Sequence, residues 1–192
     1  MYFKKPNELY FKIGCTHDEI AYEGLNGMKN LYVIGDDNRS YLTSLALNFS
    51  EINEKVLEVI FYIGQSINES IFKDIYYSCV SVIPNGDSLL QEVNRLVQYS
   101  KPNRKNLFII SNFEDFIGHD VQNYLLDMIK NAPEDYHFII GTKTLDKEVL
   151  ALIPNVLCFK TDEETSNILY QDQRACDLED NHFIYQDVIL SK

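Results

Sequence analysis

The sequence predicts an α/β fold, with a mainly parallel β-sheet that is covered by helices on both faces. Short apolar runs, each long enough for one strand and most ending at a turn residue, recur along the 192 residues. Segments with apolar residues at helical spacing lie between many of these runs. Strands that are apolar on both faces are typical of a parallel sheet, and the alternation with helices supplies its crossover connections. No linker or repeat interrupts this order, so we expect one domain over residues 1–192.

Each expected strand has an apolar run at its centre. One or two short strands are expected in residues 1–29, with a turn near Asn26 and Gly27. The later strands are expected at residues 31–34, 56–63, 78–83, 107–110, 137–140, 156–159 and 182–190. We expect the last of them to lie at an edge of the sheet.

Capping residues mark several of the expected helices. Ser88 and Gln91 have the spacing of a capping box, as do Thr161 and Glu164. Asp120 can cap the helix that follows it. The helices are expected over residues 41–49, 89–97, 121–129 and 146–153, and after residue 164.

The charge of the chain disfavours two classes of partner. Seventeen Lys and Arg residues stand against 29 Asp and Glu residues, which gives a net charge of -12. Such a surface repels nucleic-acid phosphates and anionic membranes, so we expect no nucleic-acid partner and no direct membrane contact. No apolar run approaches the ~20 residues that a membrane-spanning helix needs. The acidic excess is greatest in residues 162–192, with eight acidic and two basic residues.

The cysteines and histidines do not predict a metal site. The four cysteines form no C-x-x-C pair, and the four histidines are far apart. Cys79 and Cys158 lie in apolar runs and are expected to be small core residues.

The segment NLYVIGDDNRSYLTSLALNF, from Asn30 to Phe49, has the order strand, tight loop, helix. P-loop NTPases carry G-x-x-x-x-G-K-[ST] in the same place, where backbone N–H groups cradle phosphates. The matching residues form a degenerate phosphate loop: Gly35, Asp36, Asp37, Asn38, Arg39, Ser40, Tyr41 and Leu42. Ser40 replaces the second glycine, Tyr41 the lysine and Leu42 the hydroxyl residue. The segment therefore predicts the scaffold of a phosphate loop without its chemistry.

A second half-site is expected at the end of the strand in LFIISNFEDF, residues 107–116. At this position, active P-loop ATPases have an aspartate that holds magnesium, and often a glutamate beside it. Ser111 stands at the expected aspartate position and Asn112 at the glutamate position, while Glu114 and Asp115 follow past the strand end. We therefore expect no catalytic residue, no metal and no cofactor, with ATP bound weakly at most.

Three segments resemble the FtsK/SpoIIIE-type ATPase motors. They are FKIGCTHDEIAYEGLNGMKNLYVIG (residues 11–35), LFIISNFEDF (residues 107–116) and HFIIGTKTLDKEVLALIPNVLCFKT (residues 137–161). In the last, Gly141, Thr142 and Lys143 stand where that family usually has Ala, Thr and Gln. The resemblance extends from residue 11 to about residue 190 and implies a RecA-like P-loop NTPase fold.

Within this family, the chain resembles the degenerate C-terminal domain of the EssC and EccC coupling proteins of type VII secretion. These proteins are anchored in the cell membrane and carry tandem ATPase-like modules on its cytoplasmic side. The resemblance implies that the chain is a domain of such a longer protein. It also implies two kinds of partner: neighbouring ATPase domains of the same chain, and secreted helical proteins that the domain recognises.

Substrate recognition is the function that this pattern favours, and the chain is then not an enzyme. Tyr41, Phe113 and Phe116 lie on segments expected to converge near the strand ends, where they could accept an amphipathic helix; alternatively, they are core residues. Other readings are a structural domain of the ATPase stack or a weakly active ATPase that uses Lys143 with Glu114 or Asp115. A DNA motor is disfavoured by the net charge.

Overall fold

The computed structural model describes residues 9–15, 20–24, 30–36, 38–53, 55–64, 80–83, 89–99 and 104–192. The turn expected at Asn26 and Gly27 lies outside these residues, as do Asp37, Cys79 and the capping residue Ser88.

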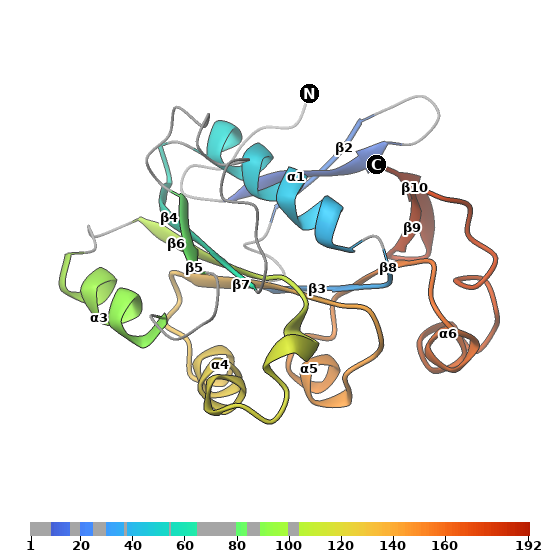
Figure 1. Cartoon of the computed structure of the whole chain (residues 1–192). Helices are drawn as coiled ribbons and strands as arrows, with labels where there is room; N and C mark the ends of the chain where they lie inside the picture. Colours follow the sequence, from blue (N-terminus) through green and yellow to red (C-terminus); the bar gives the residue numbers. More distant parts are fainter. Residues whose placement is uncertain are drawn as a thin grey trace.

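The described strands form one ten-stranded sheet, which is curled rather than flat (Figure 1). In spatial order the strands are β2 (Ile20–Gly24), β1 (Tyr10–Cys15), β10 (Val188–Ser191), β9 (His182–Tyr185), β8 (Val156–Phe159), β3 (Asn30–Ile34), β7 (Tyr136–Thr142), β6 (Lys105–Ile110), β4 (Leu57–Ile63) and β5 (Val80–Ile83). The strands from β8 to β5 are parallel, and the strands from β8 through β9, β10 and β1 to β2 pair antiparallel.

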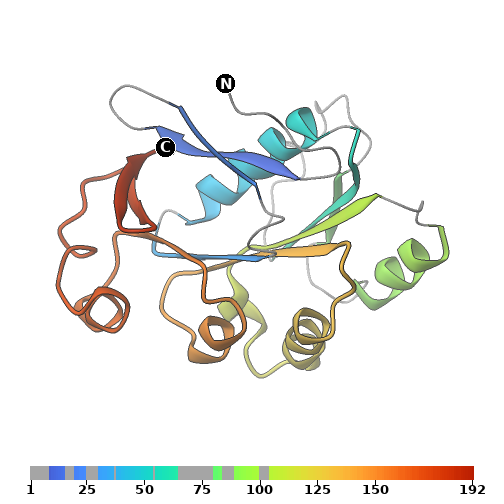
Figure 2. The same ribbon diagram turned by 180° about the vertical axis from the view of Figure 1, so that it is seen from behind.

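Helices cover both faces of the parallel part, as the sequence predicts. The helix α1 (Asn38–Ile52) lies on one face, and the curled sheet brings β1 over its outer side (Figures 1 and 2). The other face carries α3 (Leu89–Tyr99), the 3-10 helix η2 (Phe113–Phe116), α4 (Asp120–Lys130), α5 (Lys147–Leu152) and α6 (Glu163–Tyr170). No helix in the described part of the chain is both long and apolar enough to cross a membrane.

The helix α1 is enclosed between the parallel strands and β1. Phe11 of β1 stacks on Phe49 of α1, with ring centroids 5.3 Å apart. Just past the helix, the Asn53 side chain accepts a hydrogen bond from the Tyr10 N–H at 2.8 Å and donates to the Tyr10 carbonyl at 2.6 Å. These contacts make β1 part of the same core as α1.

The C-terminal segment differs from the single edge strand that the sequence predicts. Residues 182–191 form a hairpin of β9 and β10, and both strands lie inside the sheet between β8 and β1. Gln186 and Asp187 connect them with φ values of 48° and 62°, the left-handed pair required by a two-residue type I′ turn. The edge prediction is wrong, because the turn makes a second strand and each strand has a further neighbour: β9 pairs with β8, and β10 pairs with β1.

Two predicted caps are displaced by one residue. His119 is the N-cap of α4, and Asp120 is the first residue of that helix. Asp162, not Thr161, caps α6 and accepts a hydrogen bond from the Thr165 N–H at 2.8 Å. That hydrogen bond lowers the pKa of the Asp162 carboxyl.

Candidate functional site at the carboxyl ends of the parallel strands

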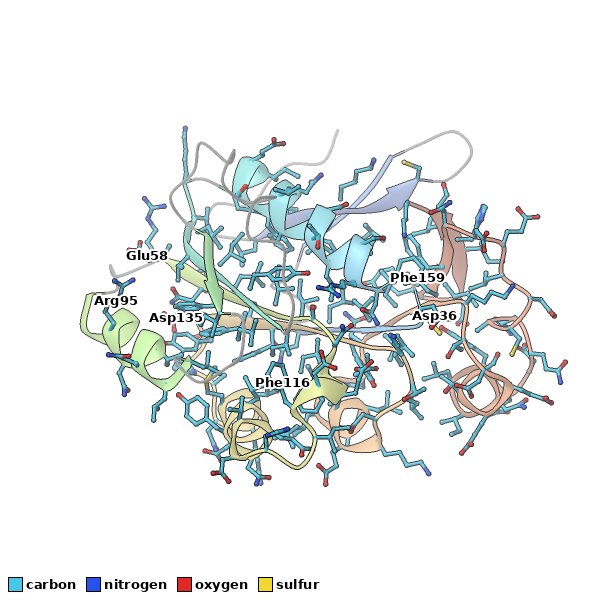
Figure 3. All side chains as sticks on the ribbon, in the orientation of Figure 1. Asp36, Glu58, Arg95, Phe116, Asp135 and Phe159 are labelled. Atoms are coloured by element: carbon cyan, nitrogen blue, oxygen red, sulfur yellow. The ribbon has the colours of Figure 1, made fainter. Side chains whose placement is uncertain are left out.

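The carboxyl ends of β3, β6, β7 and β8 meet at one edge of the sheet, where open α/β folds bind their ligands. Figure 3 shows Asp36 and Phe159, from the ends of β3 and β8, beside each other at this edge. Glu58 and Asp135 lie at the opposite edge of the sheet. The two predicted half-sites, after β3 and after β6, therefore lie at one edge, separated by the end of β7.

The connection from β3 to α1 is shorter than a phosphate loop. The helix begins at Asn38, so its first turn precedes the apolar residues at helical spacing, which start at Tyr41. The Gly35 carbonyl accepts hydrogen bonds from the Asn38 backbone N–H at 3.2 Å and from its side-chain Nδ2 at 2.8 Å. Arg39 and Ser40 are consequently exposed residues of the first helical turn rather than loop residues.

Gly35 is required by close packing against β8. Its φ is +113°, and a Cβ atom there would lie 2.7 Å from the Lys160 carbonyl oxygen and 2.8 Å from the Phe159 Cβ. Its N–H donates to the Thr142 carbonyl at 3.0 Å. The glycine thus serves the contact between β3, β7 and β8, which is a structural role.

Tyr41 is a core residue, which corrects the prediction that it contacts a partner. Its side chain is 5% exposed, and its hydroxyl donates to the Ile13 carbonyl of β1 at 2.9 Å. The ring packs against Phe159 and Phe183, with centroids 5.3 and 5.6 Å away. Burial raises the pKa of the Tyr41 hydroxyl. The tyrosine joins α1 to β1, because the curled sheet brings β1 over the helix.

Leu42 is fully buried, so it too lies away from solvent. A Cβ atom at Gly141 of β7 would lie 2.5 Å from Leu42 Cδ1 and 3.3 Å from Asn38 Oδ1. Because Gly141 has no side chain, the first turn of α1 can pack directly on β7.

Phe113 and Phe116 are also core residues, which corrects their predicted role in partner binding. They are 0% and 2% exposed and belong to the core on the face that α4 and α5 cover. Figure 3 shows Phe116 on that side of the sheet. Residues three apart in a 3-10 helix share one side of it, so η2 turns both rings inward together.

The end of β6 carries no exposed carboxylate at the two positions that the motif predicts. Ser111 is buried, and its N–H donates to the Ile63 carbonyl at 2.8 Å. Asn112 has a left-handed backbone with φ 53° and is followed directly by η2. Glu114 Oε1 accepts a hydrogen bond from the Lys143 backbone N–H at 3.0 Å. The structure thus brings Glu114 and Lys143 together through the lysine's backbone, while Asp115 lies half-buried in η2.

A polar cluster at the same edge was missed by the sequence analysis. The Tyr32 hydroxyl lies 2.8 Å from Thr142 Oγ1 and accepts a hydrogen bond from the Asp146 N–H, also at 2.8 Å. Burial raises the pKa of Tyr32 to about 12. A buried tyrosine needs a hydrogen-bond partner for its hydroxyl, so Tyr32 within an apolar strand was the sequence feature that could have predicted this cluster. The cluster ties β3 to β7 and to the start of α5.

The hollow that opens beside the β3–α1 turn is acidic. It has a volume of about 400 Å³ and is lined by Asp36, Phe159, Lys160, Glu179, Asp180, Asn181 and His182. Three carboxylates face one lysine in this set. Within the described ranges, no group of three or more His, Cys, Asp or Glu residues is arranged to hold a metal ion.

No known family profile and no curated protein sequence matches the chain. Solved structures do match it over most of its length. The conjugation coupling protein TcpA of pCW3, solved with ATPγS, gives a TM-score of 0.68 at 14% identity, covering 97% of this chain and 66% of TcpA. Thermomonospora curvata EccC (ATPases 2 and 3), in complex with a signal sequence peptide, gives 0.71 at 12% identity, with coverages of 96% and 40%. Geobacillus thermodenitrificans EssC (ATPases 2 and 3) gives 0.64 at 9% identity, with coverages of 96% and 44%.

The chain therefore has the RecA-like fold of the EccC and EssC ATPase domains, as the sequence resemblance predicts. At identities of 9–14% the similarity establishes the fold and not the activity. The chain spans less than two thirds of the length of each of these structures.

Proposed function

We propose that the chain is a degenerate ATPase module of a type VII secretion coupling protein, which recognises secreted helical proteins and does not hydrolyse ATP. The observation that carries this proposal is the closed turn after β3. Asn38 binds back to Gly35 there, and the position of the P-loop lysine is a buried tyrosine, Tyr41. The EccC structure with a signal sequence peptide supports the recognition part, since a protein with this fold binds such a peptide.

The residues at the strand ends do not fit magnesium-ATP. A phosphate loop offers free backbone N–H groups, a lysine and a hydroxyl ligand for magnesium. Here Tyr41 and Leu42 are buried in the core, and the exposed carboxylate of Asp36 adds negative charge beside the turn. Ser111 and Asn112 supply no carboxylate at the end of β6. We infer that the chain lacks the groups that bind and cleave a nucleotide triphosphate in P-loop ATPases.

Isothermal titration calorimetry with magnesium-ATP tests this inference. Two unit charges ~4 Å apart interact by about 4 kcal/mol at an effective dielectric constant near 20. Losing the lysine's attraction and gaining an aspartate's repulsion should bring the dissociation constant to millimolar or weaker. Phosphate release should stay at the level of a protein-free control. A micromolar constant, or steady turnover, would contradict the proposal and would favour the weakly active ATPase.

Binding to secreted helical-hairpin proteins tests recognition. We expect at least one such protein to bind the folded domain in calorimetry, while a helical protein of similar charge that is not secreted does not. If every secreted candidate fails to bind, the domain is better explained as a structural part of the ATPase stack. The buried hydrogen bond from Tyr41 to Ile13 favours this structural role, because it uses the Tyr41 hydroxyl inside the fold.

The same proposal places the domain beside other ATPase domains of a longer membrane protein, on the cytoplasmic side. The share of each matching structure that the chain covers, from 40% to 66%, supports this arrangement.

A further inference from the structure

A groove lies among α5, the start of β8, the end of α6 and the β9–β10 turn, away from the strand-end site. We call it the α5–α6 groove; its volume is about 420 Å³, and it is lined by Leu150, Pro154, Asn155, Val156, Ile168, Leu169, Tyr170, Gln186 and Asp187. Figures 1 and 2 show α5 and α6 side by side on the same face of the sheet. Six of these nine residues are apolar or aromatic, and polar groups contribute about as much of the groove's surface as apolar ones.

Apolar side chains at this groove are exposed to solvent. Ile168 of α6 is 44% exposed, and Val188, directly after Asp187 of the lining, is 51% exposed. Burying such surface is favourable because it removes apolar atoms from water. A partner that covers both side chains would therefore gain affinity from them.

The wall formed by Tyr170 is held in place by charged neighbours. The Arg174 guanidinium lies 5.5 Å from the centre of the Tyr170 ring. Arg174 in turn pairs with Asp172 at 2.7 Å and with Asp187 of the β9–β10 turn at 3.3 Å. These contacts connect α6 to the hairpin on the far side of the groove, so little ordering is needed when a partner binds.

The rim of the groove carries negative charge. Glu164 is exposed and lies one helical turn before Ile168, on the same side of α6. Asp187 lines the groove from the β9–β10 turn. Arg174 pairs with both Asp172 and Asp187, so these three side chains together carry one net negative charge beside the groove. A groove of mixed apolar and polar surface, with acidic residues beside it, is complementary to an amphipathic helix whose apolar face is flanked by lysine or arginine.

We propose that the α5–α6 groove binds a cationic amphipathic helix, with apolar residues at helical spacing and basic residues beside them. This inference rests on the proposed function, because it names the chemistry of the substrate segment that the domain recognises. The apolar residues cover Ile168 and Val188, and the basic residues face Glu164 and Asp187.

Fluorescence anisotropy with three labelled peptides tests the ligand chemistry. The first peptide has 18 residues, with leucines on one helical face and lysines on the other. The second has glutamate in place of lysine, and the third has the first peptide's composition in scrambled order. We expect the lysine peptide to bind at least about tenfold more tightly than either of the others. Equal binding of the lysine peptide and its scrambled form would overturn the proposal.

Charge-neutral variants of the domain locate the binding site. Ile168→Ser and Val188→Ser should each weaken binding of the lysine peptide by about fivefold or more. Ile117→Ser is the matched control, because Ile117 is 54% exposed but belongs to the connection between η2 and α4. Glu164→Gln should weaken binding by about twofold and reduce its dependence on salt. If Ile117→Ser weakens binding as much as Ile168→Ser does, the peptide binds elsewhere and the proposal is wrong.

Repeating the variants with a secreted protein separates this inference from the proposed function. If the secreted protein binds the wild-type domain and Ile168→Ser weakens that binding, both are supported. If it binds Ile168→Ser and the wild type equally, the groove is not the recognition site, although the proposed function stands. If no secreted protein binds but the lysine peptide depends on Ile168, the groove is real and the proposed function fails.

Discussion

The strand-end site and the α5–α6 groove use their side chains in opposite ways. At the strand ends, Asn38 binds back to Gly35 and the Tyr41 hydroxyl binds Ile13, so these groups are used inside the fold. At the groove, Ile168 and Val188 remain exposed. The residues that stand at the positions of the P-loop lysine and hydroxyl, Tyr41 and Leu42, are therefore part of the core, and the hollow beside the turn is acidic. Exposed apolar side chains lie elsewhere, at the α5–α6 groove.

The contrast between the two regions predicts the largest loss of stability for substitutions of Tyr41. Tyr41→Ala removes a buried ring and its hydrogen bond, and should lower the free energy of unfolding by about 3–5 kcal/mol. Tyr41→Phe keeps the ring and should cost about 1–1.5 kcal/mol, because the Ile13 carbonyl loses its partner. Urea denaturation followed by circular dichroism measures both. A stable Tyr41→Ala variant would mean that the ring is not a core residue in solution.

Gly35 offers the next largest effect. Gly35→Ala should cost about 2–3 kcal/mol, because alanine at φ +113° is strained and its Cβ meets the Lys160 carbonyl oxygen. Gly118→Ala is the matched control, since Gly118 has φ +82° but no atom within 4 Å of the added Cβ. It should cost about 1 kcal/mol, the strain alone. Equal losses in the two variants would show that the packing of the turn on β8 contributes nothing.

A moderate loss of stability is expected when the Tyr32 cluster is disrupted. Tyr32→Phe should cost about 1–2 kcal/mol, because Thr142 and the Asp146 N–H lose a buried partner. The pKa of Tyr32 is raised to about 12 from the ordinary value of 10.0, so folding favours the protonated hydroxyl. This contribution is fully present below pH 10 and is lost as the pH rises through 12. Denaturation at pH 9 and pH 11 should show a smaller alkaline loss in Tyr32→Phe than in the wild type.

The smallest effect is expected at the groove. Ile168→Ser should change the free energy of unfolding by less than about 0.5 kcal/mol, because the side chain is 44% exposed. The same variant should nevertheless weaken peptide binding. A stability loss as large as that of Gly35→Ala would instead make Ile168 a packing residue and remove the contrast between the two regions.

Most strands could be predicted from the sequence because each is a dense apolar run. The last parallel strand, Val156–Phe159, has the bounds that its apolar run predicts. The final hairpin could not be predicted, because Gln186 is unusual at the first position of a type I′ turn and Asp187 stands where glycine is usual. A local sequence pattern also does not show which strands are neighbours, so the position of β9 and β10 between β8 and β1 could not be predicted from it.

The sequence predicted the end of β3 and the turn after it, but not the surroundings of the residues that follow. The pattern after β3 located the turn, but the helix start depends on the Asn38 side chain closing onto Gly35. The burial of Tyr41 depends on Ile13 and Phe183, which are 28 and 142 positions away in the sequence. Helical spacing alone cannot show which strand lies over the helix.

The pairing of β1 with β10 has a consequence for the order of folding. Cys15 pairs with Ser191, and the Ser191 hydroxyl donates to the Cys15 carbonyl across 176 positions of sequence. On a ribosome, β1 emerges early but cannot join the sheet until β10 has been made. Contacts so distant in sequence fold slowly, in milliseconds to seconds, and leave apolar surface open meanwhile. During that interval β1 lacks its pairing with β10, and apolar residues that the two strands bury in one core, such as Phe11 and Leu190, remain more exposed than in the folded domain.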